Sequence, residues 1–257
     1  MTEKASESIE ISKIKEKLYK IGDDSAFDDF MSSFNSVESI HKYTHSFLSG
    51  FSKRDFTSNQ QVKLITDFLS FIREEMEKTG QFGDLDSALL SMDKLIHRKL
   101  YHRIFKPKND DLAKDQVLEQ RVRIFSWIEL KQLDLDFDLG ETFNLATEQL
   151  QSINKYHCPQ DKTLVILNTS IILTDILNKS PATTSADSLL PLFIYTLLQT
   201  NPSHLISNIE YIQRFTNNEQ LSGEVGYYFY TLTAAVSFIN NLDHKALSNI
   251  EKEDFER

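Results

Sequence analysis

The sequence has few of the residues that break regular structure or carry covalent chemistry. Its 257 residues include seven Gly, five Pro, one Trp and a single Cys, Cys158. So few glycines and prolines argue against an all-β fold, which needs a turn signal about every ten residues, and against glycine-rich phosphate loops. One cysteine forms neither an internal disulfide nor a cysteine zinc cage. We therefore expect Cys158 to be a structural thiol in a reducing compartment.

Long apolar runs and an excess of basic charge are also missing. The longest mainly apolar run, 189–198, contains Pro191 and is far shorter than the roughly 20 residues of a membrane-spanning helix. Residues 1–19 are charged and lack the apolar segment of a signal peptide. The formal net charge of −10 argues against a nucleic-acid partner, because neutralising phosphates requires Lys and Arg. We expect a cytoplasmic protein with no transmembrane segment.

Apolar residues recur at helical spacing through the first part of the chain. One stripe, with steps of three and four residues, consists of Val62, Ile65, Leu69, Ile72 and Met76. Thr57 or Ser58 is suited to begin this helix as its N-cap, and Gly80 to end it. A second stripe runs from Leu85 to Leu100 and stops before Pro107. These patterns predict an antiparallel helical bundle over residues 1–106.

Helical patterns resume after Pro107, over residues 107–257. The exception is 133–139, where Leu and Phe alternate with Asp at a period of two. A lone strand has no pairing partner, so we expect an extended connection pressed on the core. The fold prediction is all-α, with the bundle packed against a layered helical domain.

The usual catalytic and metal-binding patterns are weak. His41 and His45 share one predicted helix face, but Lys42 stands where a zinc protease motif has Glu, and no third ligand is evident. The pair Gly223 and Gly226 follows no strand, so it predicts a turn into a helix rather than a dinucleotide fingerprint. We therefore predict no metal and no cofactor, and a polar bundle face at the two histidines.

Polar residues at predicted helix starts mark out the region from Ser185 to Thr233. If Ser188 is the N-cap of a helix, Pro191 falls at its third position, where a missing N–H costs no helical hydrogen bond. Asp187 then lies just outside the helix, at its positive end. The alternative is that Asp187 is itself the N-cap, which the residues alone favour.

The last long predicted helix has a core stripe formed by Tyr228, Leu232, Ala235 and Ile239. Tyr227 and Thr231 lie at the edge of this stripe, about 100° around the helix. We expect Tyr227 to be half exposed, with its ring packed and its hydroxyl in solvent. The alternative role is that of a boundary tyrosine without a function beyond packing.

Three blocks in this region resemble the signature of the vacuolar-protein-sorting-nine (Vps-nine) domain. They are 186–195, 201–212 and 223–239, and they occur in the order and at the separation found in that family. Members of the family often carry a helical bundle before the domain, which suits residues 1–106. The whole sequence resembles a fungal endosomal sorting protein of this family, or its catalytic fragment.

The resemblance implies a guanine nucleotide exchange factor for Rab-five-type GTPases, associated peripherally with endosomes in endosomal and vacuolar protein transport. Such a factor regulates a GTPase without covalent chemistry, so we do not class the chain as an enzyme. Asp187 is then an acidic finger, Tyr227 contacts the switch regions, and Pro191 shapes the groove between them. Further partner contacts are implied at Tyr195, Asn208, Tyr230 and Thr231. Asn208 matches a signature asparagine, for which a structural role is the alternative. Tyr230 departs from the family, because many members have Thr or Ser there.

Two other classes of function are compatible with the residues. A helical adaptor binds a small GTPase without exchanging its nucleotide, and it has no need of Asp187. A small-molecule enzyme, with a site between the bundle and the later helices, requires converging titratable groups. The sequence offers no such set, so exchange factor is the main hypothesis and adaptor the alternative.

Overall fold

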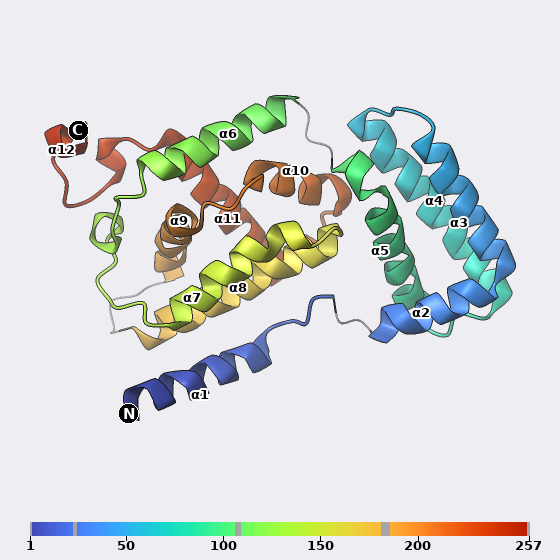
Figure 1. Cartoon of the computed structure of the whole chain (residues 1–257), viewed down its shortest axis with the longest axis horizontal. Helices are drawn as coiled ribbons and strands as arrows, with labels where there is room; N and C mark the ends of the chain where they lie inside the picture. Colours follow the sequence, from blue (N-terminus) through green and yellow to red (C-terminus); the bar gives the residue numbers. More distant parts are fainter. Residues whose placement is uncertain (1, 23–24, 106–108, 181–185, 256–257) are drawn as a thin grey trace. The chain divides into compact units, whose positions relative to one another are not determined.

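The computed structural model describes residues 2–22, 25–105, 109–180 and 186–255 (Figure 1). Within these residues the chain forms α-helices and short 3₁₀ turns and no β-strand, which confirms the all-α prediction. None of the described helices combines the length and apolar character needed to cross a membrane. The chain divides into two compact units. The bundle unit contains residues 20–106 and 157–161, and the C-terminal unit contains 1–19, 107–156 and 162–257.

The bundle unit is built from four helices, and local capping signals set their ends. They are α2 (Ser25–Ser36), α3 (Glu38–Ser52), α4 (Ser58–Thr79) and α5 (Leu85–Ile104). As predicted, Thr57 is the N-cap of α4, and it forms a reciprocal capping box with Gln60. The helix ends at Gly80, whose φ of 61° is left-handed and suits glycine. The predicted stripes line the core, with Ile72, Met76, Met92, Ile96 and Leu100 all buried.

Residues 157–161, at the start of α8 (Pro159–Lys179), complete the bundle unit. The His157 ring stacks on the Tyr101 ring at 4.2 Å between centroids. The Cys158 thiol lies 3.5 Å from the Lys94 carbonyl oxygen. Burial, and secondarily the Asp161 carboxylate, raises the pKa of this thiol to about 12. Cys158 is thus a buried, protonated packing residue, as the sequence predicts.

The C-terminal unit holds the remaining elements. They are α1 (Thr2–Lys17), α6 (Asn109–Ile124), η1 (Leu130–Leu133), α7 (Thr142–Gln151), η2 (Ser152–Lys155), the rest of α8, η3 (Ala186–Ser188), α9 (Leu189–Thr200), α10 (Leu205–Phe215), α11 (Gly223–Asn241), η4 (His244–Ala246) and α12 (Lys252–Phe255). Helix α9 is central, because α6, α7 and α11 all pack against it. Its Leu192, Phe193 and Leu197 are almost fully buried. Because α9 is held in place by this packing, the residues directly before it, Asp187 and Ser188, are held near its N-terminal end.

The segment with alternating Leu and Asp forms no strand, but only 135–139 is an irregular connection, because Leu133 ends η1 and Asp134 has a left-handed φ of 55°. Leu133 and Leu135 are buried, whereas Asp134, Asp136 and Asp138 are exposed. The alternation therefore reflects one side pressed on the core and the other in solvent, without a partner strand among the described residues.

Residues 1–19 belong to the C-terminal unit, whereas the sequence prediction grouped them with the bundle. The Tyr19 N–H donates to Asn168 Oδ1 at 2.8 Å, and Asn168 Nδ2 donates to the Tyr19 carbonyl oxygen at 2.9 Å. Ile14 is buried, and Lys17 pairs with Asp175 at 3.2 Å. An apolar stripe predicts that one side of a helix is buried, but it does not predict which other helices bury it. The sequence therefore could not assign residues 1–19 to the correct unit.

Candidate functional site

Asp187 lies in the short turn that precedes the central helix. Ser188 occupies the N-cap position of α9, so Asp187 falls outside the helix, in the turn η3. Its side chain is exposed. The sequence allowed either Asp187 or Ser188 as the N-cap of α9, and in the structure Ser188 holds that position. An exposed carboxylate therefore stands near the positive end of α9.

Pro191 and Tyr195 lie one turn apart on the same face of α9, and both are half-buried. Pro191 is the third residue of the helix, where no helical hydrogen bond needs its N–H. The Tyr195 ring packs on the Phe143 ring, with 5.5 Å between centroids. Burial raises the pKa of Tyr195, and the Glu129 carboxylate adds to the rise. This face of α9 therefore offers a proline and a neutral tyrosine.

Helix α11 packs along α9 and exposes two tyrosines. Tyr227 and Tyr230 are each 52% exposed, while the predicted core stripe from Tyr228 to Ile239 is buried. Three residues apart, the two exposed rings lie on one side of the helix. The Thr231 hydroxyl donates to the Tyr227 carbonyl oxygen at 2.8 Å, so its hydrogen bond is satisfied within the helix.

Tyr228 secures the start of α11 beneath the exposed tyrosines. Its hydroxyl donates to Glu224 Oε1 at 3.1 Å. Burial raises the pKa of this tyrosine. The Tyr227 ring lies against it, at 5.4 Å between centroids. The exposed ring therefore rests on a fixed neighbour.

A close backbone approach requires glycine at Gly226. A Cβ atom at this position would lie 2.3 Å from the Leu221 carbonyl oxygen. Gly223 begins α11 with a φ of 60°, in the left-handed region. The predicted turn into a helix is confirmed, and its tightness sets where Tyr227 begins to face solvent.

Asn208 does not reach the surface, and its contacts fit the structural role rather than a partner contact. It is fully buried in α10, and its Oδ1 accepts a hydrogen bond from Lys162 Nζ at 2.6 Å. Its Nδ2 donates to Asn154 Oδ1 at 2.9 Å and to the His204 carbonyl oxygen at 2.8 Å. Lys162 Nζ also donates to the Ile153 carbonyl oxygen at 2.9 Å. Asn208 therefore ties α8, α10 and η2 together.

Residues 143–244 match the Vacuolar sorting protein 9 (VPS9) domain. The chain belongs to the VPS9-domain family. The matched segment covers the helices from α7 to α11, and it includes the residues described above from Asp187 to Thr231. In the bundle unit, residues 42–101 match a domain of unknown function (DUF5601).

Several relatives match both parts of the chain. Vacuolar protein sorting-associated protein vps901 of Schizosaccharomyces pombe is 40% identical over 238 residues, which cover 85% of this chain and 42% of that protein. The human Rab5 GDP/GTP exchange factor is 34% identical over 245 residues, 90% of this chain and 49% of that protein. Vacuolar protein sorting-associated protein 9A of Arabidopsis thaliana is 31% identical over 229 residues, 84% and 44% respectively. The chain thus spans about half the length of the curated relatives it matches.

Sequence reasoning missed Asp115, which supports the VPS9 domain from α6. This buried carboxylate accepts hydrogen bonds from the N–H groups of Ile206 and Ser207, at 2.8 and 3.2 Å, and from the Ser207 hydroxyl at 2.6 Å. It thereby satisfies the free N–H groups at the start of α10. The signal was the absence of an N-cap side chain before Leu205, where His204 stands with a φ of 55°.

The site has the character of a protein-binding surface. It combines one exposed carboxylate with half-buried Pro191 and Tyr195 and exposed tyrosines. In the described part of the chain, no three His, Cys, Asp or Glu side chains gather closely enough to hold a metal ion. Exposed tyrosines are typical of contact surfaces for other proteins.

Proposed function

We propose that the chain is a guanine nucleotide exchange factor that promotes GDP release from a Rab5-type GTPase in endosomal and vacuolar protein transport. The names of the relatives support this, since a protein 34% identical over 90% of the chain is called Rab5 GDP/GTP exchange factor. The observation that carries the proposal is Asp187, an exposed carboxylate directly before α9 in the VPS9 domain. We further propose that the protein acts in the cytoplasm and associates peripherally with endosomes.

Asp187 acts in the nucleotide site of the GTPase. A GTPase holds GDP and Mg²⁺ through its P-loop lysine and backbone amides. An inserted carboxylate repels the β-phosphate and competes for the Mg²⁺ site. After the phosphate leaves, it pairs with the P-loop lysine and so stabilises the nucleotide-free state. Such preferential binding of one state is what shifts the equilibrium toward release.

The displaced switch regions pack on the aromatic surface of α9 and α11. Pro191 and Tyr195 form its α9 side, and Tyr227 and Tyr230 its α11 side. Tyrosine rings offer a large contact area at a small loss of side-chain freedom. At Tyr230 a ring replaces the hydroxyl that many family members present, so this contact is mainly apolar. Thr231 assists through its hydrogen bond to the Tyr227 backbone.

These contacts are sufficient for a large acceleration without covalent chemistry. A thousandfold increase in release rate needs about 4 kcal/mol off the barrier. One desolvated charge pair together with a few packed side chains supplies energies of this size. The protein is therefore a regulator that turns over without forming a bond to its partner.

The test is release of fluorescent GDP from a Rab5-type GTPase and from an unrelated Rab, with catalytic amounts of the chain. We expect acceleration only with the Rab5-type protein. Asp187→Ala is expected to lower the rate about 100-fold or more, because it removes a charge used only in the exchange intermediate. Glu148→Ala, at an exposed carboxylate on α7, is the matched control and retains the wild-type rate. Wild-type exchange by Asp187→Ala would refute the acidic-finger role.

The second candidate function is a non-catalytic adaptor for a small GTPase, which the ring at Tyr230 favours because it replaces the common Thr or Ser. An adaptor binds the GTPase without accelerating GDP release, and its affinity does not depend on Asp187. Titration of the GTPase with wild-type and Asp187→Ala protein separates the two. Unchanged affinity together with no acceleration by the wild-type chain would select the adaptor.

A further inference from the structure

Basic residues collect on one part of the bundle unit, although the chain as a whole has a net charge of −10. Residues 41–54 and 94–105 together contain seven Lys or Arg and no Asp or Glu. Most of the first segment lies in α3 and most of the second in α5, and these two helices pack against each other. The bundle therefore brings two acid-free segments together.

The exposed cations meet at the C-terminal ends of these helices. Lys53 and Arg54 follow α3, and Lys99 and Arg103 lie one turn apart on α5, all four exposed. Arg103 Nη1 lies 3.9 Å from Asp55 Oδ1, which joins the two helix ends. Asp55 is itself fully exposed, so solvent screens its attraction and the local excess of positive charge persists.

The other two cations of α5 are already engaged inside the bundle unit. Lys94 and Arg98 each lie 3.8 Å from the buried carboxylate of Asp161. Arg98 also stacks over the Phe27 ring at 4.4 Å. Their role is structural, so the cations that face solvent are Lys53, Arg54, Lys99, Arg103 and Lys42. Lys42 forms a solvent-exposed pair with Glu38 at 2.7 Å, one turn earlier on α3.

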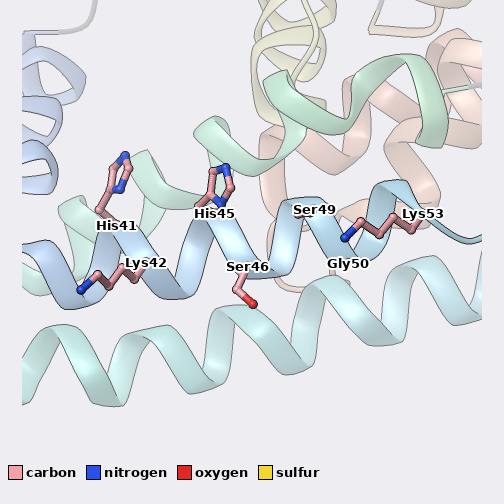
Figure 2. A pocket seen from close by; sticks show the side chains of 7 residues that line it. All are labelled: His41, Lys42, His45, Ser46, Ser49, Gly50 and Lys53. Atoms are coloured by element: carbon pink, nitrogen blue, oxygen red, sulfur yellow. The ribbon is translucent and has the colours of Figure 1, made fainter.

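A shallow depression extends this charge along α3. It has a volume of about 620 Å³ and is lined by His41, Lys42, His45, Ser46, Ser49, Gly50 and Lys53. Figure 2 shows the two lysines near opposite ends of the row. Eleven residues separate them, which corresponds to about 16 Å along the helix. A Cβ at Gly50 would meet nothing within 4 Å, so the surface is open.

We infer that this basic face, defined as Lys42, Lys53, Arg54, Lys99 and Arg103, docks on an anionic membrane surface. Lys42 lies about 16 Å along the helix from Lys53, too far for both to bind one compact anion, and the depression is too open to enclose a ligand. A lipid bilayer carrying phosphatidylserine presents many charges over a broad area, which matches both features. Each Lys or Arg near such a surface raises partitioning about fivefold. Since the chain is acidic overall, the same surface repels its other faces and so orients the bundle toward it.

Sedimentation with vesicles tests the inference on the full chain. Vesicles of phosphatidylcholine with phosphatidylserine are expected to bind the protein, and vesicles of phosphatidylcholine alone to leave it in solution. Raising the salt to about 1 M, where the Debye length is about 3 Å, is expected to release it. Each of the double variants K53E/R54E and K99E/R103E is expected to lower partitioning about thirtyfold or more.

The matched control is K63E/K78E, which changes the charge equally on exposed lysines of α4. It is expected to retain vesicle binding. Equal losses in the control and the basic-face variants would overturn the assignment to this face. Binding to soluble poly-glutamate without binding to vesicles would overturn the membrane assignment and favour an acidic protein partner. Absence of binding to any vesicles would also overturn the membrane assignment.

The inference does not depend on the proposed exchange activity. GDP release from a soluble GTPase, measured without vesicles, is expected to be unchanged in K53E/R54E, because these residues lie in the bundle unit. If the chain did not accelerate GDP release, the result with vesicles would still stand. If it did not bind vesicles, the result on GDP release would still stand. The two proposals are therefore tested separately.

Discussion

Neighbouring tyrosines at the start of α11 lie in opposite environments. Tyr228 is buried and bonded to Glu224, whereas the Tyr227 ring rests on Tyr228 and is half exposed. A one-residue step along a helix turns the side chain by about 100°, which is enough to separate a core residue from a contact residue. The two positions therefore separate an effect on stability from an effect on function.

Tyr227→Ala is expected to lower GDP exchange about tenfold or more with little change in melting temperature, because an exposed ring contributes mainly to a partner contact. Tyr228→Ala is the matched comparison, and it is expected to cost about 3 kcal/mol of unfolding free energy. Exchange assays and thermal unfolding of both variants check this. A large fall in melting temperature for Tyr227→Ala would instead assign the ring to the core.

The start of α10 depends on a carboxylate from another helix. No side chain at His204 caps it, and Asp115 of α6 supplies the missing acceptors. Such a bond acts like an N-cap, but it joins two elements as well. The stability of α10 is therefore coupled to that of α6.

Asp115→Ala is expected to destabilise the C-terminal unit by about 2–4 kcal/mol, because it removes a cap and leaves buried donors without acceptors. Trp127, the single Trp of the chain, lies in this unit, so its fluorescence in urea reports the unfolding. Gln116→Ala, at the exposed neighbour, is the control and is expected to change stability by less than about 0.5 kcal/mol. Equal midpoints for both variants would contradict the capping role.

The sequence predicted the elements whose signals are local. Thr57 and Gly80 bound α4 because a cap involves residues within one turn. The place of Asp187 outside α9 did not follow in this way, because the residues alone favoured Asp187 as the N-cap, and Ser188 holds that position without a side-chain capping bond. Asp115 could not be predicted, because its partner Ile206 lies 91 residues away. Nor could the burial of Asn208, since a polar residue is expected at the surface until its buried partner Lys162 is known.

At the scale of the whole molecule, each unit is assembled from distant parts of the chain. The bundle unit takes in residues 157–161, and the C-terminal unit takes in residues 1–19. In the first case a buried carboxylate, Asp161, faces Lys94 and Arg98 of α5. Removing one partner of a buried ion pair leaves uncompensated charge.

Asp161→Ala is therefore expected to destabilise α5 by about 2 kcal/mol. Hydrogen exchange of the α5 amides is the measurement, and faster exchange is the expected result. The control is Asp86→Ala, which breaks the exposed pair with Arg73 and is expected to change exchange little. Unchanged protection of α5 in Asp161→Ala would show that the other contacts of residues 157–161 suffice.

The bond between Tyr19 and Asn168 also has a consequence for the order of folding. Its partners are 149 residues apart, so α1 is synthesised well before the α8 residues that it contacts. Until α8 has been synthesised, α1 has no surface to cover and its apolar side stays in solvent. Contacts this distant in sequence slow folding, because a long loop must close before they form. During synthesis there is therefore an interval in which Ile14, buried in the folded chain, is exposed to other proteins.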